Sequence, residues 1–299
     1  MTILVATDFS DNSKNALRLG VKMAKDRGRA VVLMHVVDLA ARDNAWRVLV
    51  ESPDDIERSA LKEGRQRLEE FFQETISDVD RPSAVRYEVA LGNPIDQLLS
   101  HAKTFADPVI IAGTRGGSRL QEFFLGSTAH RLVRQTEKPV VLVPSDTEIK
   151  EFEHLLVAVD FSAASRKALR VAGAMAREHL ANLHVVHGFI IPEVTALQAS
   201  MASMTTEIDE IVKTKLASLR EMVAEEGVDD VISEIDVRQM SPATAILTMA
   251  EDSSADLLFM GTHGRQGWSR FFIGNTAERV MRRVPCPLFV VSCPEEKEK

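Results

Sequence analysis

The amino-acid sequence predicts an α/β protein made of two copies of one unit, each a parallel sheet with helices on both faces. Two observations support this prediction. Short apolar runs rich in β-branched residues alternate with amphipathic helical patterns along the chain, and this order favours parallel strands joined by right-handed crossovers. The same segments also recur after about 150 residues, which is the size of a whole domain.

The first copy is expected to follow the order βαβαβαβαβ. Its first helix should end just before Gly28, a residue type that commonly terminates helices. The long second helix is charged and should bury only a stripe, formed by Leu61, Leu68, Phe71, Phe72 and Ile76. We expect strands at 3–7, 30–37, 84–90, 108–114 and 139–143, and helices from about 12, at 54–78, at 94–106 and from about 127.

The second copy repeats the first. The segment ILVATDFSDNSKNALRLG, which starts at Ile3, matches LLVAVDFSAASRKALRVAG, which starts at Leu155. The polar segment SDTEIKEFEH, residues 145–154, lies between the copies and is expected to be a linker, so the predicted domains are 1–146 and 152–299. Matching residues in the two copies are Asp8 and Asp160, His35 and His187, and Gly113 and Gly261.

Composition and charge exclude several classes of protein. The 299 residues are 45% hydrophobic and 27% charged, with a formal net charge of −8, which argues against nucleic acid or an anionic membrane as the main partner. No signal peptide or membrane span is visible, and the two cysteines, Cys286 and Cys293, end one predicted strand about 23 Å apart. These features predict reduced thiols, a cytoplasmic location and no membrane insertion.

The segment GTRGGSRLQEFFLGS, starting at Gly113, carries the strongest functional signal. Gly113, Gly116 and Gly126 have the spacing Gly-x2-Gly-x9-Gly, followed by Ser127, and the second copy repeats the glycines in register. In a doubly wound sheet of strand order 3-2-1-4-5, ligands bind where the order reverses, between strands 1 and 4. Asp8 follows strand 1 and Gly113 ends strand 4, so both are expected at that crevice.

The spacing suits a phosphate-bearing ligand. Glycines permit positive φ and a close backbone approach, and a helix that starts at Ser127 would present unpaired N–H groups to an anion. Ser127 is expected to cap that helix or to donate its hydroxyl to phosphate, and the Asp8 carboxylate suits an adenine amine or ribose hydroxyls. The loop is neither a Walker A loop nor a Gly-x-Gly-x-x-Gly motif. Nearby arginines that would add positive charge are Arg115, Arg119 and Arg131.

At these residues the sequence resembles the universal stress protein family over essentially the whole chain, as a tandem member. The resemblance implies two flavodoxin-like domains of the adenine nucleotide alpha hydrolase-like type, a role in stress response and binding of ATP, ADP or AMP. Asp8 could hold Mg²⁺ through the phosphates of ATP. By carry-over from the family, Ala6, Asp8 and Val36 would surround adenine and ribose. The phosphates would be held by Gly113, Arg115, Gly116, Gly126, Ser127 and Thr128.

The second copy departs from this pattern, so a weaker site is expected there. Asn275 replaces the serine or threonine, although it should cap the helix equally well, and Gly188 stands where the first copy has Val36. The first copy should therefore bind nucleotide more tightly. The candidate residues of the second copy are Asp160, Gly261, Gly264, Gly274, Asn275 and Thr276.

Three functions remain open at this point. The first is a regulatory adenine-nucleotide-binding module; the second is a weak ATPase or autophosphorylating enzyme; the third is a scaffold with at least one vestigial pocket. No nucleophile–base pair and no carboxylate pair at catalytic spacing is visible, so no catalytic or metal-ligating residue is assigned, and His35 and His187 are expected to be packed strand residues. The apolar final strands predict pairing of the two copies about a pseudo-twofold axis, and a homodimer is an option.

Overall fold

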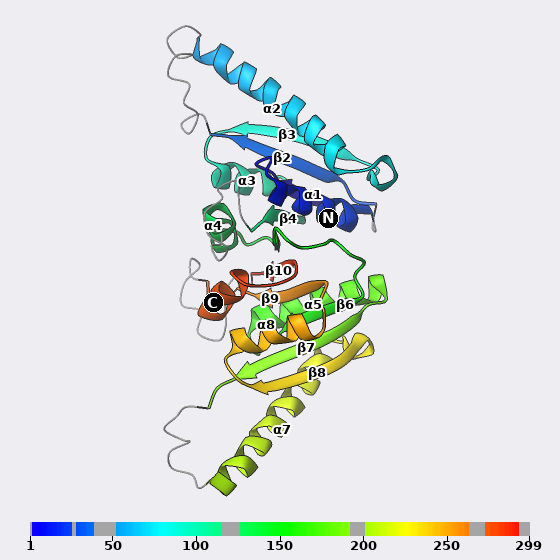
Figure 1. The fold of residues 1–299 in the computed structure, drawn as a ribbon, viewed down its shortest axis with the longest axis vertical. Coiled ribbons are helices and arrows are strands. Elements are labelled where there is room, and N and C mark those ends of the chain that lie inside the picture. The colour runs from blue at the N-terminus through cyan, green and yellow to red at the C-terminus, as the bar shows by residue number, and fades with distance from the viewer. Residues whose placement is uncertain are drawn as a thin grey trace. The chain divides into compact units, whose positions relative to one another are not determined.

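The computed structural model describes residues 2–25, 28–38, 52–114, 126–191, 201–262 and 273–292. The chain divides into two compact units, Met1–Ile149 and Lys150–Lys299, and each is described by itself. Both units alternate strands and helices, as Figure 1 shows.

The first unit contains five strands and four α-helices among its described residues. Three of the helices start or end at residues that favour a boundary: Ser52 caps α2, Asn93 caps α3, and Gly28, at φ 59°, follows α1. The elements are β1 (Thr2–Ala6), α1 (Asp11–Lys25), β2 (Val31–Val37), α2 (Pro53–Thr75), the short 3-10 helix η2 (Asp78–Asp80), β3 (Val85–Leu91), α3 (Pro94–Ala102), β4 (Pro108–Gly113), α4 (Ser127–Gln135) and β5 (Val140–Val143).

The strands of the first unit lie in the order β3-β2-β1-β4-β5, all parallel. The centre of the sheet is β1, where Ile3, Leu4 and Val5 are fully buried. It pairs with β2 on one side and β4 on the other, with Val5 opposite Leu33 and Ile111. The helices α1 and α2 pack together on one face, and α3 and α4 pack together on the other, as right-handed crossovers require.

The second unit repeats this arrangement, with the strand order β8-β7-β6-β9-β10 and parallel pairing throughout. Its central strand is β6, whose residues Leu155, Leu156 and Val157 are buried. The elements are β6 (His154–Ala158), α5 (Ala163–His179), β7 (Asn182–Phe189), α7 (Met201–Glu225), the short 3-10 helix η3 (Asp229–Val231), β8 (Ile232–Gln239), α8 (Pro242–Asp252), β9 (Leu257–Gly261), α9 (Asn275–Met281) and β10 (Leu288–Val291).

The predicted fold class and the strand order 3-2-1-4-5 are confirmed in both units. One local expectation is wrong: Leu61 lies on the exposed side of α2 rather than in its buried stripe. The segment 145–154 contacts the units at both ends. The Asn15 side chain donates to the carbonyls of Ser145 and Thr147, and Phe152 is buried against His179.

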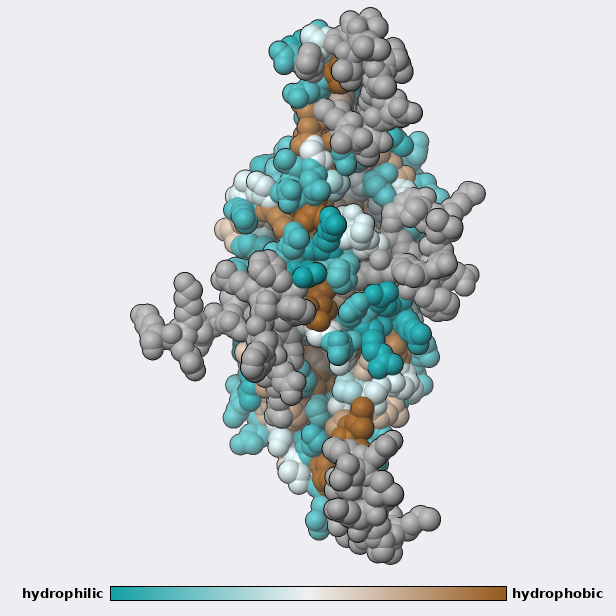
Figure 2. All heavy atoms as spheres, turned by 90° about the vertical axis from the view of Figure 1, so that its left-hand side faces the viewer, coloured by the Kyte–Doolittle hydropathy of each residue, from teal (hydrophilic) through white to brown (hydrophobic). Residues whose placement is uncertain are grey.

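Polar and charged side chains cover most of the surface that Figure 2 colours, and the hydrophobic residues of that face form small separate areas. The large apolar side chains of the described residues are mostly buried on the strands and on the inner faces of the helices. No helix in the described ranges is long and apolar enough to span a bilayer.

Burial controls the chemistry of Cys286, which precedes β10. Removal from water raises the pKa of its thiol from about 9 to about 12, and the nearby Asp256 carboxylate acts in the same direction. The reactive thiolate is therefore almost absent at neutral pH. Cys293, at the other end of the predicted strand, lies outside the described residues.

We expect Cys286 to resist alkylation by iodoacetamide in the folded protein and to react only after unfolding. Because the thiol ionises more readily in the unfolded chain, the raised pKa also affects stability. The contribution of Cys286 to the free energy of unfolding is fully present below about pH 9 and is lost as the pH rises toward about 12. Mass spectrometry of a Cys293→Ser variant, with and without urea, checks the labelling. Fast labelling of the native variant would contradict the burial argument.

Candidate functional site

The carboxyl end of β1 continues into a tight turn that carries Asp8. The Asp8 carboxylate accepts hydrogen bonds from the backbone N–H of Ser10, at 3.1 Å, and from the Ser10 hydroxyl. The buried Ser13 hydroxyl lies 2.8 Å from that of Thr7 and donates to the Ser10 carbonyl. The turn is thus held by side-chain hydrogen bonds, while Asp8 itself stays exposed to solvent.

Phe9, the residue after Asp8, adopts a left-handed backbone conformation with φ 64°. This conformation is unfavourable for a bulky residue, and the surroundings of the ring compensate for it. The Phe9 ring lies 4.3 Å from the His35 ring, centroid to centroid, and 5.7 Å from that of Phe71. His35 is fixed in turn by a 2.8 Å hydrogen bond to the Thr7 carbonyl.

The second unit repeats the hydrogen bonds of the carboxylate, although Val159 stands where the first unit has Thr7. Asp160 accepts from the N–H and hydroxyl of Ser162, and Phe161 has φ 65°. His187 is 7% exposed, and its Nδ1 lies 2.7 Å from the Val159 carbonyl. A carbonyl only accepts, so Nδ1 carries the proton. Both strand histidines are packed residues that orient the turn.

The ends of the fourth strands lie beside these turns. Two residues before the end of β4, Ile111 pairs with Val5 of β1, which places Gly113 beside the start of the Asp8 turn. The contact is direct in the second unit. A Cβ added to Gly261 would lie 2.7 Å from the Ala164 Cβ and 3.1 Å from the backbone nitrogen of Ser165, at the start of α5. Gly261 is therefore required by helix packing.

One helix N-terminus opens at this edge of each sheet, and neither of the two is capped by a side chain. The helices α4 and α9 begin after Gly126 and Gly274, and neither glycine has a side chain to accept from the first N–H groups. By contrast, the hydroxyl or amide oxygens of four other residues accept backbone N–H bonds at the starts of α2, α3, α5 and α8. These residues are Ser52, Asn93, Ser162 and Ser241.

The glycine loops close back on the strands that precede them. The N–H of Gly126 donates to the carbonyl of Thr114 at 2.7 Å, and the N–H of Gly274 donates to that of Thr262 at 3.0 Å. The first turn of α4 or α9 is thereby attached to the residue that follows β4 or β9. The carboxylate turn, the end of the fourth strand and the helix N-terminus thus share one edge of each sheet.

Two expectations about this loop are wrong. Ser127 and Asn275 do not cap the helices, because each is the first helical residue and the caps are glycines. The glycines that flank the loop also have no positive φ: Gly126 is at −58° and Gly274 at −60°. Any residue adopts that conformation, and the atom nearest to a Cβ built on Gly274 is 3.5 Å away, so the described protein atoms do not require glycine at position 274.

The second unit has Gly188 where the first has Val36, and helix packing explains this change. A Cβ on Gly188 would lie 2.7 Å from the backbone of Pro242 and 2.8 Å from the Ala245 Cβ, both in α8. The Val36 side chain is half-buried at the matching place on β2. The glycine at 188 therefore permits close approach of α8 to β7, whatever the ligand. Arg115, Gly116 and Gly264 lie outside the described residues.

Sequence reasoning missed the residues that hold the carboxylate turn. Ser13 and Ser165 occupy the same place in both copies and hydrogen-bond in the same way to the preceding serine carbonyl. The left-handed Phe9 and Phe161 were not expected, since only glycine, asparagine and aspartate commonly adopt that conformation. The available signal was the recurrence of Asp-Phe-Ser followed by serine in both copies.

The fold and the repeated carboxylate turn define a tandem doubly wound α/β protein. A model of the Universal stress protein family matches residues 1–144 and 151–292, and the chain belongs to that family. A universal stress protein of Mycolicibacterium smegmatis is 27% identical over 97% of this chain and 96% of its own length. Universal stress protein YxiE of Bacillus subtilis is 30% identical over 47% of this chain and 97% of its own length.

A solved structure shows the same fold. The crystal structure of a universal stress protein from Archaeoglobus fulgidus superposes with a TM-score of 0.64, covering 97% of this chain and 98% of that one at 22% identity. The tandem arrangement of two such domains is thus shared with proteins of similar length.

We expect Gly261→Ala to lower the free energy of unfolding by about 1–3 kcal/mol, because the added methyl group overlaps the start of α5. Gly274→Ala is the matched control in the same unit and should change stability by less than about 1 kcal/mol, since its surroundings and φ accept a Cβ. Urea unfolding followed by circular dichroism measures both. Equal effects would mean that the contact with α5 does not determine the residue at 261.

Proposed function

We propose that the chain is a regulatory adenine-nucleotide-binding protein and that the first unit carries its tighter site. The nucleotide would lie at the carboxyl edge of the sheet, between the ends of β1 and β4. Adenine and ribose would contact the edge near Ala6, Asp8 and Val36. The phosphates would lie against Gly113 and the start of α4, where Gly126, Ser127 and Thr128 are exposed or half-buried, together with Arg115 and Gly116 of the loop.

The observation that carries this proposal is the uncapped N-terminus of α4. The first N–H groups of a helix need acceptors and carry positive partial charge. Side-chain oxygens accept from the first N–H groups of α2, α3, α5 and α8. The cap of α4 is Gly126, which has no side-chain oxygen. A phosphate oxygen would serve as the missing acceptor. The Ser127 hydroxyl, exposed at the first helical position, would donate to the same group.

The Asp8 carboxylate suits the other end of the ligand. It is exposed, its orientation is fixed by the Ser10 N–H, and it retains lone pairs for donors such as ribose hydroxyls. It could also face a Mg²⁺ ion that arrives with the phosphates, since hard cations prefer oxygen ligands. Among the described residues, no group of three or more His, Cys, Asp or Glu side chains is placed to hold a metal.

The second unit would bind nucleotide more weakly. Asn275 places an amide where the first unit has the smaller Ser127, and α9 is shorter than α4, with 7 residues against 9. Packing against α5 already explains why residue 261 is a glycine, so this glycine is no evidence for a ligand. The residues of this weaker site would be Asp160, Gly261, Gly264, Gly274, Asn275 and Thr276.

We expect Asp8→Asn to weaken ATP binding about tenfold or more, because the amide oxygen keeps the Ser10 hydrogen bond while the charge is lost. Asp160→Asn is the matched control and should leave the tighter binding event within about twofold. Isothermal titration calorimetry of the full chain with ATP, ADP and AMP measures both. Equal losses from the two variants would contradict the assignment of the tighter site to the first unit.

Gly126→Val tests the phosphate end. At φ −58° the backbone accepts valine, so the fold should survive while the side chain obstructs the approach of phosphate to α4. We expect a loss of ATP affinity of about tenfold or more, and a smaller loss for adenosine, which has no phosphate. Thermal unfolding without nucleotide checks the fold. Unchanged ATP affinity in folded Gly126→Val would exclude α4 as the phosphate site.

Assembly belongs to the same proposal. Taking the domains as 1–146 and 152–299, the short apolar strands β5 and β10 would provide edges for pairing of the two copies within the chain, and a homodimer of whole chains is a further option. Solution scattering and analytical ultracentrifugation, with and without ATP, measure whether the state of assembly depends on nucleotide.

A further inference from the structure

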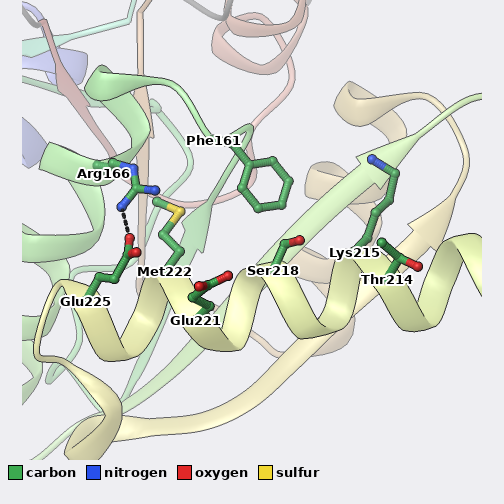
Figure 3. A pocket seen from close by; sticks show the side chains of 8 residues that line it. All are labelled: Phe161, Arg166, Thr214, Lys215, Ser218, Glu221, Met222 and Glu225. Carbon is green, nitrogen blue, oxygen red and sulfur yellow. Dashed lines mark hydrogen bonds and ion pairs between the residues drawn. The ribbon is translucent and has the colours of Figure 1, made fainter.

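A cavity of about 400 Å³ lies in the second unit between α7 and the turn that follows β6. Figure 3 shows the Phe161 ring above the helix, with Ser218 and Glu221 on the side of α7 that faces it. The side chains of Met222, Lys215 and Arg166 also line the cavity. The volume is within the range of small-molecule sites.

The first unit shows what occupies the matching space there. The Arg67 guanidinium lies over the Phe9 ring, 4.3 Å from its centroid, and Phe71 contacts the same ring edge-on at 5.7 Å. A guanidinium over an aromatic face is held by the negative potential of the ring. In the first unit, therefore, the chain's own arginine covers the phenylalanine that follows the carboxylate.

The buried positions of the two long helices establish which residues correspond. Leu68, Phe71 and Phe72 of α2 have the same spacing as Leu219, Met222 and Val223 of α7, and all six are buried. This alignment places Ser218 where the first unit has Arg67, and Met222 where it has Phe71. Two large side chains are thus replaced by a hydroxymethyl group and an unbranched thioether, and the cavity lies over Phe161 at this place.

Two of the charged side chains that line the cavity, Arg166 and Lys215, contact other groups of the protein. Arg166 donates to Glu225 at 2.8 Å and to Glu226 at 3.1 Å. The Lys215 ammonium lies 3.3 Å from Nε2 of His187 and closer to the Phe189 ring than to the Phe161 ring, at 5.2 against 6.0 Å. Glu221 takes part in no ion pair with another described residue. Its carboxylate is therefore available to a cation that enters the cavity.

We propose that this cavity binds a small guanidinium compound, whose cation takes the place over Phe161 that Arg67 takes over Phe9. The guanidinium plane would stack on the Phe161 ring, and its N–H groups would donate to the Glu221 carboxylate and the Ser218 hydroxyl. The apolar part of the compound would contact Met222. Phe161 directly follows Asp160 of the proposed weaker nucleotide site, but the two sites use different residues and this proposal does not depend on nucleotide binding.

The experiment uses the full chain and three probes of one shape: butylguanidinium, its neutral analogue N-butylurea, and butylammonium. Ligand-observed NMR and calorimetry measure their affinities. We expect one site per chain for butylguanidinium, with affinity about tenfold or more above that for N-butylurea, since the urea lacks the charge, and butylammonium in between. Equal binding of the guanidinium and the urea, or no saturable binding of butylguanidinium, would overturn the proposal.

Variants locate the site by restoring the residues of the first unit. Ser218→Arg places a guanidinium within reach of Phe161 and should abolish binding of the probe, while Ala217→Arg adds the same side chain at the neighbouring exposed position of α7 and should leave affinity within about twofold. If Ser218→Arg does not fold, Met222→Phe replaces it as the test variant, because it narrows the cavity without adding charge.

Glu221→Gln should weaken the binding of butylguanidinium about tenfold and leave the binding of N-butylurea unchanged. Folded Ser218→Arg or Met222→Phe that retains full affinity would overturn the assignment.

Discussion

The burial of the central strand is the constraint on which the rest of each unit depends. In the first unit the middle of β1, Ile3 to Val5, is completely buried, and α1 approaches it so closely that a Cβ on Gly20 would lie 2.5 Å from a Val5 methyl group. Because the strand pairs on both sides and is covered on both faces, its polar residues can meet solvent only beyond its ends. The carboxyl end of β1 is therefore where Asp8 emerges, beside the end of β4.

The turn beyond β1 carries a strain that the packing offsets. Phe9 and Phe161 adopt left-handed backbone conformations, which cost about 1–2 kcal/mol for residues other than glycine. Each ring lies against a histidine of the neighbouring strand, and each histidine bonds to the carbonyl just before the aspartate. The aromatic contacts and the serine hydroxyls together fix the direction of the carboxylate. Exact recurrence of this unfavourable geometry in both units indicates that the position of the aspartate matters to the protein.

The sequence was sufficient for the fold because each element had an unambiguous pattern. Every described strand and α-helix of the first copy was expected, with ends that differ by a few residues, whereas the 3-10 helix η2 was not. Alternation of short β-branched runs with helical periodicity leaves few other topologies. The adjacency of the first and fourth strands followed from the same order. The roles of single residues did not follow. Ser127 or Gly126 is the cap of α4 depending on whether the helix starts one residue earlier or later, and a sequence pattern does not locate a helix end to one residue. Glycine at 188 is explained by its short distance to α8, and this distance depends on the packing of two segments that are far apart in the sequence.

Duplication makes the two units controls for each other, and the comparison separates folding from ligand chemistry. Features present in both, such as the carboxylate turn and the uncapped N-termini after the glycine loops, belong to the shared scaffold. Features present in one unit mark divergence. The space over the phenylalanine ring contains Arg67 in the first unit, whereas the second has Ser218 there and a cavity with an available carboxylate. Since the surrounding buried positions are kept, the fold permits this exchange at low cost, and the two halves of one chain have acquired different surfaces on the same framework.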